Sequence, residues 1–214
     1  MTKIISILDY GVGNIFSLTK AFELCGAEVR LISEPSQLKN VDKLILPGVG
    51  AFAKAMDELN KRNFTDSIKE YALSEKPLMG ICLGAQMLLS ESYEYGIHAG
   101  LDLIKGKVIK ISDIEANAAQ HKVPYVAWSE LHKPKNNINW DKTILSGIKS
   151  GVTAYFVHSF TFIPDNEENR LVDTFYDGVR LCAAVKEGNI YGTQFHPERS
   201  GKYGLQIINN FVQL

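Results

Sequence analysis

The chain has 214 residues, of which 45% are hydrophobic and 22% are charged, and its net charge is −1. These proportions are those of a globular protein, so disorder, collagen and coiled coil are excluded as the main state. Because 23 basic residues are offset by 24 acidic ones, the chain lacks the basic footprint of a nucleic-acid binder. We expect one domain covering residues 1–214, since there is no repeat and no Gly/Ser-rich or Pro-rich linker.

The N-terminus and the cysteines predict a cytoplasmic protein. Met1–Asp9 is apolar but short, and it lacks the small-residue cleavage site of a signal peptide. No run approaches the ~20 consecutive apolar residues of a membrane span. Cys25, Cys82 and Cys182 are odd in number and widely spaced, which is typical of reduced thiols. We therefore expect no membrane association.

In the first half of the chain, apolar runs alternate with helical patterns. Apolar residues recur at helical spacing over Asn14–Cys25, and Gly26 follows as a helix stop. The expected strands are Lys3–Asp9, Glu28–Ile32, Lys43–Leu46 and Leu78–Ile81, and the further expected helices are Phe52–Asn60 and Phe64–Ser74. This alternation predicts right-handed βαβ crossovers and a mostly parallel sheet.

The second half is rich in strand patterns with few helices between them. The expected strands are Gly106–Ile111, Val123–Leu131, Thr153–His158, Leu171–Tyr176, Leu181–Glu187 and Ile190–Phe195. An amphipathic helix, Tyr203–Val212, closes the chain. We predict an α/β fold with a mixed, mostly parallel central sheet flanked by helices, and antiparallel additions in the second half.

The segment Pro77–Gln86 carries the clearest chemical signal. An apolar strand runs into Gly-Ile-Cys-Leu-Gly and then a helix, which is a nucleophile elbow with Cys82 in place of serine. Gly80 and Gly84 suit the crowded turn because they lack a Cβ. A helix N-terminus favours the thiolate of Cys82, and the Leu83 amide would point towards an oxyanion. The alternative is a buried structural cysteine between two packing glycines.

His196 is the candidate base for this nucleophile. It ends an apolar strand, where the catalytic groups of open sheets gather, and Glu198 follows two residues later. A carboxylate so close can hold the imidazole in one tautomer and stabilise its protonated form. A loop histidine beside a surface glutamate is the alternative, but the elbow in the same domain favours a Cys82–His196–Glu198 triad.

The remaining cysteines and the glycine-rich loops indicate no metal and no cofactor. Cys25 and Cys182 lie on apolar stripes and are expected to be small buried hydrophobes, and no Cys/His spacing fits zinc. Pro47–Phe52 lacks the Lys-Ser/Thr of a P-loop, and Asp9–Asn14 lacks the third glycine of a dinucleotide fingerprint. Either both loops are simply tight βα turns, or an amide of Pro47–Phe52, from Val49 or Gly50, completes an oxyanion hole with Leu83.

Together these motifs resemble a known family, over nearly the whole chain. Gly80–Gln86 with Gln194–Glu198 is similar to the class I, or triad, glutamine amidotransferases. Asp9–Asn14, Pro47–Phe52 and Tyr155–Phe160 resemble one branch, the glutaminase subunits of imidazole glycerol phosphate synthase. The resemblance implies that glutamine is the substrate and that a glutamyl thioester forms, releases ammonia and is hydrolysed.

The resemblance also implies a role for each matching position. Cys82 would attack the glutamine side chain with help from His196, which Glu198 would orient. The amides of Leu83 and Val49 would hold the oxyanion. The positions that match the glutamine pocket are Gly50, Gln86, Glu94, His158, Ser159 and Phe160.

A partner subunit is implied in the same way. In this branch a (β/α)8-barrel cyclase forms a heterodimer with the glutaminase and receives the ammonia. The glutaminase is nearly idle alone, because one peptide of the loop matching Pro47–Gly50 points away from the oxyanion until the partner's ligand binds. Glycine tolerates both signs of φ, so Gly48 and Gly50 fit such a flip.

The sequence departs from this branch at two places, so other functions remain as alternatives. The usual Pro-His-Met-Gly-Trp-Asn, which faces the partner, is replaced by Pro-Tyr-Val-Ala-Trp-Ser at residues 124–129, and Phe160 stands where tyrosine is frequent. A paralogue that supplies ammonia for sugar amidation in surface-polysaccharide synthesis therefore remains an alternative. So do a stand-alone cysteine hydrolase, such as a γ-glutamyl peptidase, and a non-catalytic regulatory subunit.

Overall fold

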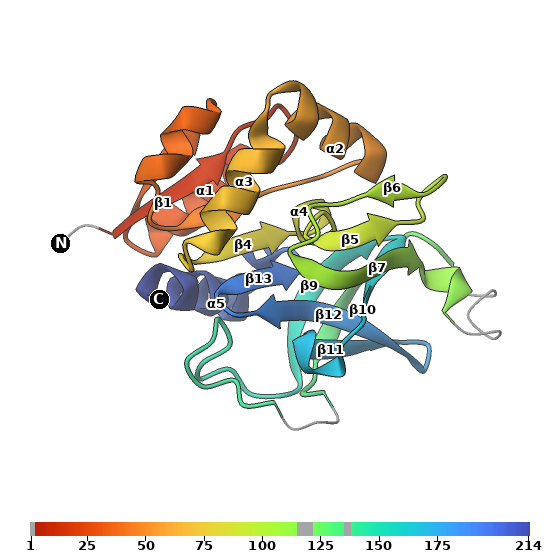
Figure 1. Ribbon diagram of the computed structural model, residues 1–214. Coiled ribbons are helices and arrows are strands. Elements are labelled where there is room, and N and C mark those ends of the chain that lie inside the picture. Colours follow the sequence, from red (N-terminus) through yellow and green to blue (C-terminus); the bar gives the residue numbers. More distant parts are fainter. Residues whose placement is uncertain (1–2, 115–121, 135–137) are drawn as a thin grey trace.

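A mixed sheet forms the centre of the computed structural model, which describes residues 3–114, 122–134 and 138–214 (Figure 1). Its first part is the parallel array β2-β1-β3-β4-β13. These strands are β1 (Lys3–Leu8), β2 (Ala27–Ile32), β3 (Leu44–Leu46), β4 (Leu78–Ile81) and β13 (Ile190–Thr193). Because they run in parallel, the carboxyl ends of β3, β4 and β13 lie at one edge of the sheet, which is where α/β proteins place their ligands.

The sheet continues with strands from the second half of the chain. In order these are β12 (Val179–Glu187), β10 (Phe160–Pro164), β7 (Ile104–Lys110), β5 (Leu89–Ser92) and β6 (His98–Ala99), with β11 (Arg170–Tyr176) paired to β12. Most of these pairs are antiparallel, but β5 and β7 are parallel. A separate hairpin-like sheet joins β8 (Tyr125–Leu131) to β9 (Val152–His158).

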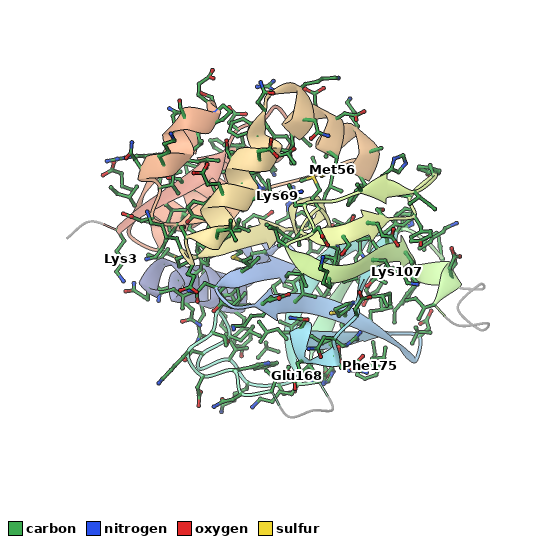
Figure 2. The ribbon with its side chains drawn as sticks, in the orientation of Figure 1. Lys3, Met56, Lys69, Lys107, Glu168 and Phe175 are labelled. Atoms are coloured by element: carbon green, nitrogen blue, oxygen red, sulfur yellow. The ribbon has the colours of Figure 1, made fainter. Side chains whose placement is uncertain are left out.

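Helices cover both faces of the parallel array. The helices are α1 (Ile15–Leu24), α2 (Phe52–Lys61), α3 (Phe64–Leu73), α4 (Leu83–Gln86) and α5 (Gly201–Gln213). In Figure 1, α3 lies on one side of β4 and α5 on the other. Each face has its own apolar cluster: α1 and α5 pack on one, where Phe22 and Phe211 meet edge to face, and α2 and α3 pack on the other. Charged residues such as Lys69, Lys107 and Glu168 are exposed on the outside (Figure 2).

The predicted fold class is confirmed, and the expected elements recur within a few residues of their predicted bounds. Three strands were not expected: β5, β6 and β10. The first two are short, and β5 carries polar residues over Leu89–Ser92. β10 was missed because the chain leaves the β8–β9 sheet at Ser159 and enters the central sheet at once, so its pattern continues that of β9.

Candidate active site

Cys82 occupies a sharp turn between β4 and α4. Its backbone has φ 54° and ψ −112°, a conformation that side-chain-bearing residues rarely adopt. A Cβ on Gly84 would stand 1.9 Å from the Leu46 carbonyl oxygen, and one on Gly80 would stand 2.7 Å from Ala85. The predicted elbow is therefore present, and the glycines permit it. The helix that follows has only four residues, so its dipole contributes less to the thiolate than the sequence suggested.

His196 and Glu198 form a buried pair next to the elbow. The imidazole Nδ1–H donates to Glu198 Oε1 at 2.8 Å, and the two side chains are 9% and 2% exposed. The backbone is fixed as well, because the His196 amide donates to the Tyr155 carbonyl and Ser200 Oγ donates to the His196 carbonyl. With Nδ1 bonded to Glu198, the other ring nitrogen, Nε2, is left for Cys82.

The charge state of His196 follows from its neighbours. Burial opposes a charge on the imidazole, but hydrogen bonds and charge interactions with Cys82 and Glu198 outweigh it and raise the pKa of His196 to about 10. At neutral pH the imidazole is therefore protonated. A protonated imidazole beside the sulfur can deliver a proton to a leaving amine, which the chemistry of a thioester enzyme needs.

A cavity of about 690 Å³ opens over these groups. Its lining includes ten of the eleven residues singled out from the sequence: Val49, Gly50, Cys82, Leu83, Gln86, Glu94, His158, Ser159, Phe160 and His196. The eleventh, Glu198, lies behind His196. The structure thus brings all the candidate residues together, whereas their individual roles remain predictions.

Sequence reasoning assigned no role to several other residues at the site. The cavity is also lined by Tyr93, Tyr95, Lys110, Asp113, Val123, Pro124 and Val157. Gln194 is fully buried beneath it and links two parts of the site: it accepts from Gln86 Nε2 at 2.9 Å and donates from Nε2 to Cys82 Sγ at 3.8 Å. Its place in the Gln-Phe-His-Pro-Glu motif was the available signal.

His158 is held as a neutral acceptor. Its Nδ1–H donates to the Phe160 carbonyl at 2.8 Å, and because a carbonyl only accepts, the proton must sit on Nδ1. Burial, opposed by this hydrogen bond and assisted by the charge of His196, lowers the pKa of His158 to about 4. Nε2 is buried and has no partner within the described part of the chain. It is therefore available to a donor on a bound molecule.

The oxyanion loop, which we define as Pro47–Ala51, runs beside the elbow. Gly48 approaches it so closely that a Cβ would stand 2.5 Å from the Gly84 amide nitrogen. Gly50 has φ +94°, in the region that favours glycine, and the Val49 side chain is 44% exposed. The loop therefore lies close to Leu83, as the predicted oxyanion hole demands, and Gly50 has a backbone conformation that glycine adopts readily.

The other thiols are poor nucleophiles. Burial raises the pKa of Cys182 to about 12 and also raises that of Cys25. Within residues 3–114, 122–134 and 138–214, no three His, Cys, Asp or Glu side chains converge as metal ligands would. Over the same ranges, no helix has the length and hydropathy needed to cross a bilayer.

The family model for "Glutamine amidotransferase class-I" matches residues 6–214. The chain belongs to this family. Among its relatives, "Imidazole glycerol phosphate synthase subunit HisH 1" of Legionella pneumophila (strain Paris) is 47% identical over 98% of this chain and 99% of its own length. Subunit HisH of Syntrophotalea carbinolica is 40% identical over 97% and 98%. Both relatives match the chain over nearly its full length.

Solved structures agree on the fold. The structure titled "Structure of PurLQS from Thermotoga maritima" superimposes with a TM-score of 0.75 at 20% identity and covers 100% of this chain and 99% of that chain. One titled "Crystal structure of glutamine amidotransferase" gives a TM-score of 0.72 at 17% identity, covering 98% and 99%. The class-I amidotransferase fold is therefore shared in full.

Proposed function

We propose that this protein is the glutaminase subunit of an imidazole glycerol phosphate synthase. It hydrolyses glutamine to glutamate and ammonia, and it passes the ammonia to a cyclase subunit in histidine biosynthesis. The observation that carries the chemistry is the buried Cys82–His196–Glu198 array, in which the pKa of His196 is raised to about 10. The full-length similarity to HisH subunits carries the choice of branch.

The first half-reaction forms a thioester. The Cys82 thiolate attacks the side-chain carbonyl carbon of glutamine, and the amides of Leu83 and Val49 stabilise the negative oxygen. The C–N bond then breaks while the His196 imidazolium gives its Nε2 proton to the departing nitrogen, which leaves as ammonia. Glu198 keeps the imidazole aligned throughout, because its carboxylate accepts from Nδ1.

The second half-reaction regenerates the enzyme. The now neutral imidazole takes a proton from water, and the resulting hydroxide attacks the thioester carbon. Collapse of this intermediate expels the Cys82 thiolate and releases glutamate, with His196 again protonated. The raised pKa of His196 suits this cycle, since it keeps the imidazole protonated until the departing nitrogen takes the proton.

The zwitterionic end of glutamine needs two opposite charges in the pocket. Glu94 provides a carboxylate for the α-ammonium group. His158 is neutral and cannot balance a carboxylate, whereas Lys110 is a cationic side chain on the cavity wall. β7 and β10 place Lys110 directly opposite Phe160, so we assign Lys110 to the α-carboxylate. Gly50, Gln86, Ser159 and Phe160 complete the pocket.

Exposed apolar residues near the cavity support docking of a barrel cyclase. Val126 and Trp128 of β8 are 54% and 56% exposed, and Val49 beside the nucleophile is 44% exposed. Such side chains are costly to leave in water and are enriched at protein interfaces. A partner here would also shield ammonia, which is protonated in bulk water before it can react.

The experiment that tests the proposal compares glutaminase rates of the lone chain, its complex with the cyclase of the same organism, and the complex with the cyclase's ligand. We expect slow hydrolysis by the lone chain and stimulation by about 10² or more, the size of a restored oxyanion donor. Equal rates in all three would favour a stand-alone hydrolase.

The replaced segment at residues 124–129 keeps one other function open, ammonia supply for sugar amidation. A histidine auxotroph lacking its own glutaminase subunit separates the two: growth without histidine, given this chain and its cyclase, supports the synthase. Stimulation by a sugar amidotransfer partner in place of the cyclase would favour the alternative.

A further inference from the structure

The first turn of α2 is capped from a distant part of the chain. Its N-cap residue is Ala51, which has no side-chain oxygen to satisfy the helix's free amides. Instead, Glu94 Oε2 accepts from the Phe52 amide at 2.6 Å, across 42 residues of sequence. A carboxylate at this end of a helix is also favoured by the helix dipole. Glu94 thus performs the capping that Ala51 cannot.

Glu94 is itself held firmly enough to act as an anchor. Its amide donates to Ser92 Oγ at 3.2 Å, and Ser92 is fully buried at the end of β5. β5 in turn pairs with β7 in the central sheet. The backbone of Glu94 is therefore attached to the end of a strand of the central sheet, and its carboxylate extends from there to α2.

The oxyanion loop, Pro47–Ala51, lies between two fixed points. At one end Gly48 packs against the elbow, where a Cβ would meet the Gly84 nitrogen at 2.5 Å. At the other end the Phe52 amide is bonded to Glu94. Between them Gly50 has φ +94°, in the region that favours glycine, and a Cβ there would meet no atom within 4 Å. The position of the Val49 amide therefore depends on both attachments.

We propose that Glu94 is a positioning residue for the oxyanion loop, in addition to lining the pocket. This inference rests on the proposed function, because it assumes that the loop faces the oxyanion of glutamine. The Glu94 carboxylate then bonds Phe52, the residue that follows the loop, and Glu94 also borders the substrate cavity. Binding of glutamine and alignment of the Val49 amide are coupled through it, without any contact between substrate and α2.

Three variants separate the effect of the charge of Glu94 from the effect of its side-chain length. Glu94→Gln keeps a side-chain acceptor for the Phe52 amide but removes the charge. Glu94→Ala removes both, and Glu94→Asp keeps the charge on a side chain one methylene shorter. The matched control is Glu91→Gln on the same strand, because Glu91 contacts the Tyr93 hydroxyl and not α2.

Steady-state glutamine hydrolysis by the full chain with its cyclase gives the readout. We expect Glu94→Gln to raise KM while kcat stays within about threefold. Glu94→Ala and Glu94→Asp should lower kcat by about tenfold or more, a fraction of the 10²–10³ lost when an oxyanion donor is removed outright. Hydrogen exchange at the Phe52 amide should be slow in the wild type and in Glu94→Gln, and faster in the other two.

Equal kcat values for Glu94→Gln, Glu94→Ala and Glu94→Asp would overturn the positioning role while leaving the glutaminase function intact. A wild-type complex that does not hydrolyse glutamine would overturn the proposed function and this inference with it. If Glu94→Ala does not fold, Glu94→Asp decides alone: an unchanged kcat refutes the inference.

Discussion

Replacing Glu198 with glutamine tests what keeps the His196 imidazole, the proposed acid and base, positively charged. Glu198→Gln keeps the shape of the side chain but removes the negative charge 2.8 Å from His196 Nδ1. The pKa of His196 is raised from 6.5 to about 10, against the effect of burial, by Cys82 and then by Glu198. At 1.36 kcal/mol per pH unit, this rise corresponds to on the order of 5 kcal/mol in favour of the imidazolium.

Glu198 contributes part of this stabilisation of the imidazolium. A hydrogen bond to a charged group contributes about 1.5–3 kcal/mol, so the variant should lower the pKa of His196 by roughly 1–2 pH units. Because Cys82 remains, His196 should stay protonated at pH 7. We therefore expect kcat/KM at pH 7 to fall by about 10–100-fold, mainly through lost alignment. His196→Ala should cost more, about 10³-fold or beyond.

The assay is kcat/KM for glutamine against pH, measured on the complex with the cyclase. The alkaline limb of the profile, where the imidazolium loses its proton, should move to lower pH in Glu198→Gln. The control is Glu187→Gln, which removes the same charge from an exposed position at the end of β12. An alkaline limb at the wild-type pH would refute the assignment of Glu198 as the residue that stabilises the charge.

Protein stability should follow the same linkage. Since the folded pKa of His196 lies above the unfolded value, its stabilising contribution is complete below pH 6.5 and is lost as pH rises through about 10. Urea unfolding should thus show a falling free energy between these values. In Glu198→Gln the loss should begin at lower pH, and identical curves for the two proteins would contradict the coupling.

Three further predictions address the nucleophile, the pocket and the core. A glutamine-analogue alkylator at pH 7.5 should label Cys82 and spare Cys25 and Cys182, because burial raises the pKa values of the latter two thiols. Mass spectrometry of the peptides identifies the labelled cysteine. A label on Cys25 or Cys182 would rule out Cys82 as the nucleophile of the elbow. Lys110→Met should raise KM for glutamine about tenfold with little change in kcat, and an unchanged KM would exclude it from carboxylate binding. Asp173→Asn should lower the free energy of unfolding by about 3–5 kcal/mol, because the buried Asp173 carboxylate pairs with both Arg170 and Arg180. A loss below about 1 kcal/mol by urea titration would contradict this.

The elbow and the His196–Glu198 contact were predictable because their signals are local. The elbow lies within the five residues Gly80–Gly84. Glycine is needed on both sides of the cysteine because a Cβ at either position would clash with backbone atoms. His196 and Glu198 are two residues apart, so their contact also depends on a short stretch of backbone. The family resemblance then supplied the pocket positions, which the structure brings around one cavity.

Contacts between distant segments were not predictable from patterns. The Gln86–Gln194 hydrogen bond spans 108 residues, and the Glu94–Phe52 hydrogen bond spans 42. Neither glutamine stands out from the many polar residues of the chain by spacing or periodicity. Both glutamines lie within family motifs, but those motifs do not show that the two side chains bond each other.

One strand pairing decides whether the site exists at all. β13 lies parallel to β4, with Gly192 opposite Gly80, and the Cys82 amide donates to the Thr193 carbonyl at 2.7 Å. A Cβ on Gly192 would stand 2.8 Å from Val185, so the close packing of this strand on its other neighbour also requires glycine. Because Cys82 follows β4 and His196 follows β13, a shift of either strand by one residue would move the imidazole away from the sulfur. Short motifs thus supply the chemical groups of the site, whereas the distance between those groups depends on the register between two strands from opposite halves of the chain.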